Sequence, residues 1–294
     1  MTKEDALQWE ARWARPVAVS AFLAGFVLLV GTFLLQSIFE DRKRLEALPD
    51  FLVSVDASPG KLIGSQVLLA ASALLLIPVF FYLFSAIIHR TPQLPRWFVW
   101  LVLIGPIFYA VSLVIGAIDR VDVAHQFVER TATVGDCPGY LGKAGDDCAK
   151  DLLAEDVSPI SVGLSLAGSV ATAFLFVMLP LRARRAGLLS QFMSILGVIA
   201  GALMVLRLMP LVPEITQAFW LGAIGALYLG NWPGGRGPAW ESGEPDPWPS
   251  AAQRRGQLAE DDAEPPPAEP AEPEAEAEPT PQRPSSRKRR RKKR

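Results

Sequence analysis

The residue types that most often carry catalysis or bind metals are scarce in this sequence of 294 residues. It contains two histidines, His89 and His125, and two cysteines, Cys137 and Cys148. A zinc site needs about four Cys or His ligands at fixed spacing, and the sequence has neither a C-x-x-C pair nor a G-x-x-x-x-G-K-[ST] phosphate loop. We therefore predict no catalytic, metal or cofactor site, and we expect the chain not to be an enzyme.

The two cysteines remain candidates for a disulfide. Both lie in segment 119–156, and the residues between Cys137 and Cys148 are rich in glycine, which allows the chain to close a ring. A bridge there would stabilise the segment by about 2–3 kcal/mol through the denatured state. We predict the bridge because the segment is expected to face an oxidising compartment. Two unpaired thiols are the alternative.

The sequence ends in eight consecutive cations, preceded by an acidic, proline-rich stretch from Glu260 to Glu278 that contains no base. The cations are Arg287, Lys288, Arg289, Arg290, Arg291, Lys292, Lys293 and Arg294. Such a run can bind anionic lipid headgroups, at about 1 kcal/mol per residue near the surface, or a protein partner. It can also pair with the acidic stretch. We expect no specific nucleic acid, because no folded reading module accompanies the run.

Six long apolar runs, none of which contains Asp, Glu, Lys, Arg or His, must position these charged segments. Each is close to or above the length of about 20 residues that crosses a bilayer. They are 16–39, 62–88, 97–118, 157–181, 188–206 and 215–232. The predicted fold class is an all-α integral membrane protein with about six transmembrane helices over 16–232. The last two runs are the shortest, so a re-entrant pair is the alternative there.

The ends of the chain differ in composition from this transmembrane domain. Residues 1–15 form a short N-terminal segment with Trp9 and Trp13 on one face of an expected interfacial helix. Residues 233–294 are rich in Pro, Glu, Ala and Arg and cannot bury enough apolar surface to offset the entropy of ordering. We predict a disordered tail there. Segment 119–156 is expected to begin with a separate surface helix, over 121–134.

Small residues recur at helical spacing in the third, fourth and fifth runs, where they let helix backbones approach closely. They are Ser112, Gly116, Gly163, Ala167, Ala171, Gly197 and Gly201. Four glutamines in or beside the runs can bond between helices or line a polar path. They are Gln36, Gln66, Gln191 and Gln217.

Positive charge predicts the orientation, because cytoplasmic loops carry more Lys and Arg. Arg182, Arg184 and Arg185 crowd one short loop, and the N-terminal segment and loop 89–96 are also dense in cations. We therefore expect both termini in the cytoplasm and segment 119–156 outside. The basic stretch 42–44, directly after the first run, argues against this orientation.

The general pattern resembles multi-pass proteins of bacterial plasma membranes, although no motif narrows the resemblance. The apolar runs lack the ionisable residues that proton relays and ion pathways require. The leading hypothesis is therefore a non-enzymatic protein that acts through its charged tail, in contact with membrane lipids or a protein partner. The alternative is a transporter or permease for an uncharged or lipid-like molecule.

Overall fold

The computed structural model describes residues 2–38, 48–91, 95, 97–132, 143–156, 158–206 and 211–249. Every element in these ranges is a helix, which confirms the all-α class. The helices are α1 (Lys3–Gln36), α2 (Leu48–Ala57), α3 (Pro59–Arg90), α4 (Phe98–Ala132), α5 (Lys143–Asp156), α6 (Pro159–Arg185), α7 (Gln191–Leu206), α8 (Val212–Leu229) and α9 (Pro238–Ser242).

The chain divides into two compact units, 1–248 and 249–294. The first unit holds all nine helices of the described ranges. Almost all of the second unit lies outside the described residues, and with it most of the predicted disordered tail and the terminal cations.

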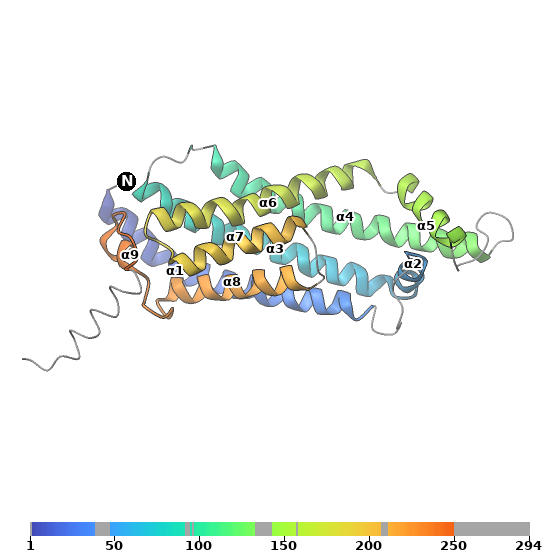
Figure 1. Ribbon diagram of the computed structural model, residues 1–294, viewed down its shortest axis with the longest axis horizontal. Helices are drawn as coiled ribbons and strands as arrows, with labels where there is room; N and C mark the ends of the chain where they lie inside the picture. The colour runs from blue at the N-terminus through green and yellow to red at the C-terminus, as the bar shows by residue number, and fades with distance from the viewer. Residues whose placement is uncertain are drawn as a thin grey trace, which may run out of the picture. The chain divides into compact units, whose positions relative to one another are not determined.

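The first unit is a ring of antiparallel helices. Contacts join α1 to α3, α3 to α4, α4 to α6, α6 to α7, α7 to α8, and α8 back to α1. In Figure 1 these six helices run side by side, with α9 and the N-terminus at one end and α2 and α5 at the other. We call these the α9 end and the α2 end. The alternation places the beginning of α1 and the end of α8 together at the α9 end.

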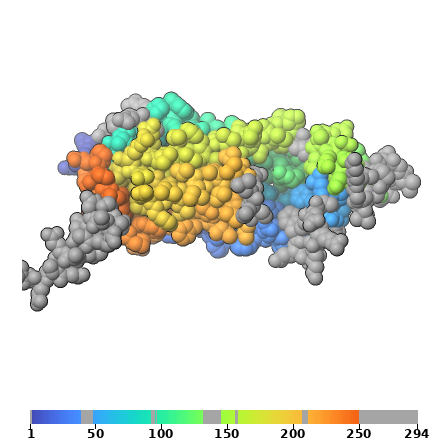
Figure 2. Space-filling view, viewed as in Figure 1, coloured from blue at the N-terminus to red at the C-terminus, as the bar shows by residue number. Residues whose placement is uncertain are grey.

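Within the described ranges, four helices are long and apolar enough to cross a membrane, which suggests a membrane protein. They are α1, α3, α4 and α6, and α4 qualifies over Phe98–Thr131. They contain the first four predicted runs almost entirely. Helix α7 is apolar but has only 16 residues, and α8 has 18 residues with Glu214 in its first turn. Figure 2 shows α6, α7 and α8 together on one face of this unit.

Two predicted elements differ from the observed ones. The short interfacial helix before the first run is the first part of α1, which begins at a capping box of Thr2 and Asp5 and continues through Pro16. The separate helix expected from residue 121 is instead a continuation of α4. Both helices are thus continuous from the apolar run into the neighbouring polar sequence.

A second core explains why α4 extends so far. Beyond the ring, α4 packs against α2 and α5 at the α2 end, where Phe127, Leu52 and Leu152 are almost fully buried. Full burial of one such side chain stabilises the folded state by about 1.5–3 kcal/mol. Helices α2 and α5, which lie in the connections from α1 to α3 and from α4 to α6, therefore pack together with α4 at this end of the ring.

Aromatic residues fill the ring toward the α9 end. Phe80 of α3 meets Phe176 of α6 edge-on at 5.0 Å between ring centroids, and Trp220 of α8 lies 5.2 Å from Phe176. All three are fully buried. The Trp220 indole N–H donates to the carbonyl of Met193 in α7 at 3.1 Å. This aromatic plug ties α3, α6, α7 and α8 together.

Candidate functional site

The part of the predicted tail nearest the bundle is folded. Helix α8 ends at Gly230, whose φ of 80° is the left-handed conformation that glycine favours at a helix end. The chain then turns back, and residues 236–248, which we call the docking segment, cover the α9 end of the ring. The tail boundary predicted at 233 is therefore too early, because the compact unit runs to Trp248.

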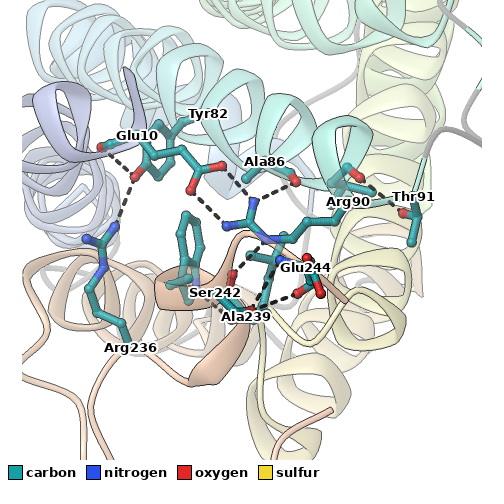
Figure 3. A network of polar contacts seen from close by, with 12 residues as sticks. Glu10, Tyr82, Ala86, Arg90, Thr91, Arg236, Ala239, Ser242 and Glu244 are labelled. Atoms are coloured by element: carbon teal, nitrogen blue, oxygen red, sulfur yellow. Dashed lines mark hydrogen bonds and ion pairs between the residues drawn. The ribbon is translucent and has the colours of Figure 1, made fainter. Parts of the chain in front are cut away.

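A buried ion pair lies directly beneath the docking segment (Figure 3). Arg90, the last residue of α3, holds both carboxylate oxygens of Glu10 in α1, with N–O distances of 2.6 and 2.9 Å. The side chains are only 1% and 2% exposed. Arg90 also donates to the Ala86 carbonyl at 3.0 Å and, through Nε, to the Ala239 carbonyl at 2.9 Å. One guanidinium thus joins α1 and α3 to α9.

Trp240 of α9 closes the site from the side of the docking segment. Its indole stacks on Tyr82 at 5.7 Å and donates to the Leu188 carbonyl at 2.9 Å. The guanidinium of Arg90 lies 5.3 Å from the indole centroid and that of Arg236 lies 5.0 Å from it. Cation–π contacts of this kind are worth about 0.5–2 kcal/mol, more where they are desolvated. Trp240 is 4% exposed, so α9 contributes a true core side chain.

Tyr82 links this surface to the first helix. Its hydroxyl donates to the Glu10 carbonyl at 2.9 Å and accepts from Arg236 at 3.1 Å. The ring stacks on Trp9 at 5.5 Å between centroids. Trp9, predicted at a membrane interface, thus contributes to the packing beneath the docking segment.

The rim of the site is polar and exposed. Lys3 donates to Glu244 at 2.7 Å, with both side chains at least half exposed. This hydrogen bond from the Lys3 ammonium holds the pKa of the Glu244 carboxyl below its ordinary value. The pair lines a cavity of about 300 Å³ beside Glu10 and Arg90.

The docking segment also crosses the turn between α6 and α7. Gly187 has a φ of 74°, and a Cβ there would collide with the carbonyl oxygen of Asp246. Only glycine meets both demands, the left-handed backbone and the close approach. The segment is therefore fitted to α1, α3 and the α6–α7 turn together.

We call these contacts, which join the docking segment to Glu10, Tyr82, Arg90 and the α6–α7 turn, the clamp. Its role is structural. The charged groups of Glu10 and Arg90 bond each other and the backbone. Within the described part of the chain, no three His, Cys, Asp or Glu side chains lie close enough to hold a metal ion. The clamp holds residues 236–248 in place, directly before the chain continues into residues 249–294.

The predicted disulfide and basic run fall largely outside the described residues. Cys148 lies in α5 and packs against the second core. Cys137 and the run 287–294 lie outside the described residues. The bridge and the lipid or partner contacts of the run remain predictions.

The small residues of the predicted packing stripes have different surroundings. A Cβ on Gly201 would lie 2.7 Å from the Ala173 carbonyl oxygen of α6, and one on Gly197 would lie 2.6 Å from Pro180. Ala171 faces Gly105 of α4, at 3.2 Å from an added Cβ.

Other members of these stripes lack such neighbours. A Cβ on Gly163 would meet no described atom within 4 Å, and Ala167 is exposed. Helix α6 instead meets α4 closely at Gly168, where an added Cβ would collide with the backbone nitrogen of Tyr109. On α4, Ser112 bonds the Tyr109 carbonyl, and an added Cβ on Gly116 would lie 3.4 Å from Arg120.

The four glutamines do not form one path. Gln66 and Gln217 both line a cavity inside the ring. Gln191 is exposed at the start of α7, and Gln36 is half-buried at the end of α1.

The clamp could not be deduced from the spacing of its residues. Glu10 and Arg90 are far apart in the sequence, and each resembles an ordinary charge beside an apolar run. The one available signal is aromatic: Trp240 and Trp248 lie in a segment that otherwise reads as disordered. Disordered segments contain few aromatic residues.

No family model, curated protein or solved structure matches the chain.

Proposed function

We propose that the protein is a non-enzymatic membrane protein that acts through its charged C-terminal tail, and that the clamp anchors the docking segment from which this tail continues. The observation that carries this proposal is the docking segment itself. A buried bidentate ion pair, a buried tryptophan and a fitted turn hold residues 236–248. If the position of the tail had no importance, the chain would not need a tightly packed segment just before it.

We propose further that all six ring helices cross the membrane. The exposed faces of the two shorter helices support this, because they carry large apolar side chains. These are Phe192, Ile195, Ile199 and Val205 on α7, and Ile215 and Phe219 on α8. At 1.5 Å per residue, helices of 16 and 18 residues reach about 24–27 Å, slightly less than the hydrocarbon thickness of about 30 Å. Local thinning accommodates such a difference.

The orientation we propose places the α9 end in the cytoplasm of a bacterial cell, in the plasma membrane. Arg182, Arg184 and Arg185 lie in the last turn of α6, at the same end as the docking segment. With the base of the tail there, the terminal cations start on the side where anionic lipid headgroups attract them.

Partner capture tests the tail proposal, and the clamp dictates where the chain must be cut. Deleting everything from 233 would remove Trp240 and expose the buried ion pair, so losses would report unfolding. A truncation after Pro249 keeps the docking segment. We expect it to lose the bound proteins or anionic lipids that co-purify with the full chain. Identical partners and lipids in both preparations would remove the reason for the proposal.

A transporter for an uncharged or lipid-like molecule is the second candidate, favoured by the cavity inside the ring. Flux in proteoliposomes tests it. We expect Gln66→Ala, inside the cavity, to change the flux, and the exposed Gln191→Ala to leave it unchanged. Equal flux in the native protein and in both variants would count against a transport role for this cavity.

A further inference from the structure

A cavity of about 460 Å³ lies inside the ring on the side of the aromatic plug that faces the α2 end. All six ring helices and α2 contribute to its lining. Leu76, one turn before Phe80 of the plug, marks its inner limit, and Phe51 of α2 marks the other. This volume falls within the range of about 300–1,000 Å³ that is typical of small-molecule sites.

Two buried polar side chains in the lining lack a partner. Gln66 of α3 is 6% exposed and Thr172 of α6 is fully buried. Neither the Gln66 Oε1 nor the Thr172 Oγ1 has a hydrogen-bond partner among the described residues. An unsatisfied buried group of this kind costs about 1–3 kcal/mol. Two such groups facing one cavity indicate that something else satisfies them.

A third unpartnered atom defines the chemistry further. Glu214, in the first turn of α8, lines the same cavity, and its Oε2 is buried without a partner in the described structure. An amide oxygen and a carboxylate oxygen accept hydrogen bonds, and a threonine hydroxyl can accept as well as donate. The unsatisfied capacity is thus mainly acceptor capacity. The rest of the wall is mixed: it carries leucines, among them Leu28, Leu69 and Leu76, together with several polar side chains and the exposed cation Arg120.

From this combination we propose that the cavity binds a small amphiphile whose head group donates hydrogen bonds, an alcohol or an amine, with its apolar body against the leucines. We expect an acceptor-only anion of the same length to bind more weakly, because it offers nothing to Gln66 or Glu214. The cation of the lining, Arg120, is exposed and donates to the Gly116 carbonyl at 3.1 Å. This site goes beyond the tail function proposed above and does not depend on it.

Substitutions separate this role from a structural one. Thr172→Val and Gln66→Leu remove an unpartnered group and keep its approximate volume. Removing such a group leaves the empty protein as stable as before or more so. Losing its bond to a ligand weakens binding about threefold to tenfold, the range for one hydrogen bond. Ser72→Ala is the matched control, because Ser72 lines the same cavity but already donates to the Ala24 carbonyl at 2.9 Å. It lowers stability and leaves binding unchanged.

The experiment uses the full chain in phosphatidylcholine nanodiscs and three eight-carbon probes that carry a photoreactive diazirine: an alcohol, an amine and a carboxylate. After irradiation, peptide mass spectrometry locates the adducts. We expect saturable labelling by the alcohol and the amine on the segments around Gln66 and Thr172, competed by unlabelled octanol and octylamine, with weaker labelling in the two variants. Labelling confined to lipid-facing residues, labelling that does not saturate, or equal labelling by the carboxylate would overturn the proposal.

Discussion

Removal of the Arg90 side chain is the sharpest perturbation of the clamp. In the native chain Glu10 and Arg90 are both buried beneath the docking segment. When the segment lifts away, both reach water and can stay paired. Without Arg90, the Glu10 carboxylate is buried alone whenever the segment is docked, and the Ala239 carbonyl loses its donor. Arg90→Ala therefore acts on the docking equilibrium itself.

The size of the effect follows from the burial. Breaking a buried ion pair by removing one partner costs about 3–5 kcal/mol. Since about 1.4 kcal/mol corresponds to a tenfold change in an equilibrium constant, the population with a detached segment should rise by at least about a hundredfold. Replacing both members by apolar residues of similar size is often nearly neutral. Glu10→Leu with Arg90→Met should therefore recover most of the protection.

Limited trypsin digestion measures the population of molecules in which the docking segment is detached. The bond after Arg236 lies at the start of the docking segment, and the Arg236 guanidinium packs over Trp240. Intact-mass spectrometry follows the fragment that ends at Arg236. When closing is fast, its rate of appearance tracks the open population.

The exposed pair on the same surface provides the control. Lys3→Ala removes a bond to Glu244 between two exposed side chains, so the rate should change only a few-fold at most. Cleavage of Arg90→Ala at the native rate would refute the reasoning, as would a double variant that is cleaved faster than either single one.

Two further predictions concern helix packing and the cysteines. Gly168→Ala places a methyl against the backbone of α4 at Tyr109 and should cost about 1–3 kcal/mol, or roughly 2–4 °C of melting temperature per kcal/mol. Gly163→Ala on the same helix meets no neighbour and should melt at or above the native temperature; equal melting of the two variants would contradict the assigned contact. Peptide mapping without reduction should recover Cys137 and Cys148 in one linked peptide, and alkylation of both thiols before reduction would disprove the bridge.

The sequence is most informative where composition alone decides the structure. Runs such as 62–88 and 157–181 predict α3 and α6 to within a few residues, because uncharged stretches of that length have few alternatives to a helix in hydrocarbon. Helix ends that lie in polar sequence are harder to predict. The sequence predicts short helices before residue 16 and after residue 118, but nothing in it shows that they are continuous with the apolar runs, as they are in α1 and α4.

The clamp shows a different limit. In the sequence, Arg90 resembles any other cation beside an apolar run, and it belongs to the charge pattern that predicts the orientation. Its bonds to Glu10 and Ala239 depend on how α1, α3 and α9 come together. The tail boundary is predicted too early for the same reason. The chain around Trp240 has a composition typical of disorder, but it folds because it packs against α1, α3 and the α6–α7 turn. The unpartnered Gln66 and Thr172 likewise become a site only when six helices enclose one cavity.

The central claim is that six helices cross the membrane and that the docking segment lies on the cytoplasmic side. Single cysteines in a chain whose two native cysteines are replaced by serine test it directly, with a membrane-impermeant maleimide applied to intact and to broken cells. Lys61→Cys and Val212→Cys, exposed at the starts of α3 and α8, should be labelled in intact cells. Glu244→Cys, exposed on the docking segment, should be labelled only after lysis. Labelling of Val212→Cys only in broken cells would mean that α7 and α8 do not cross, and would contradict the account.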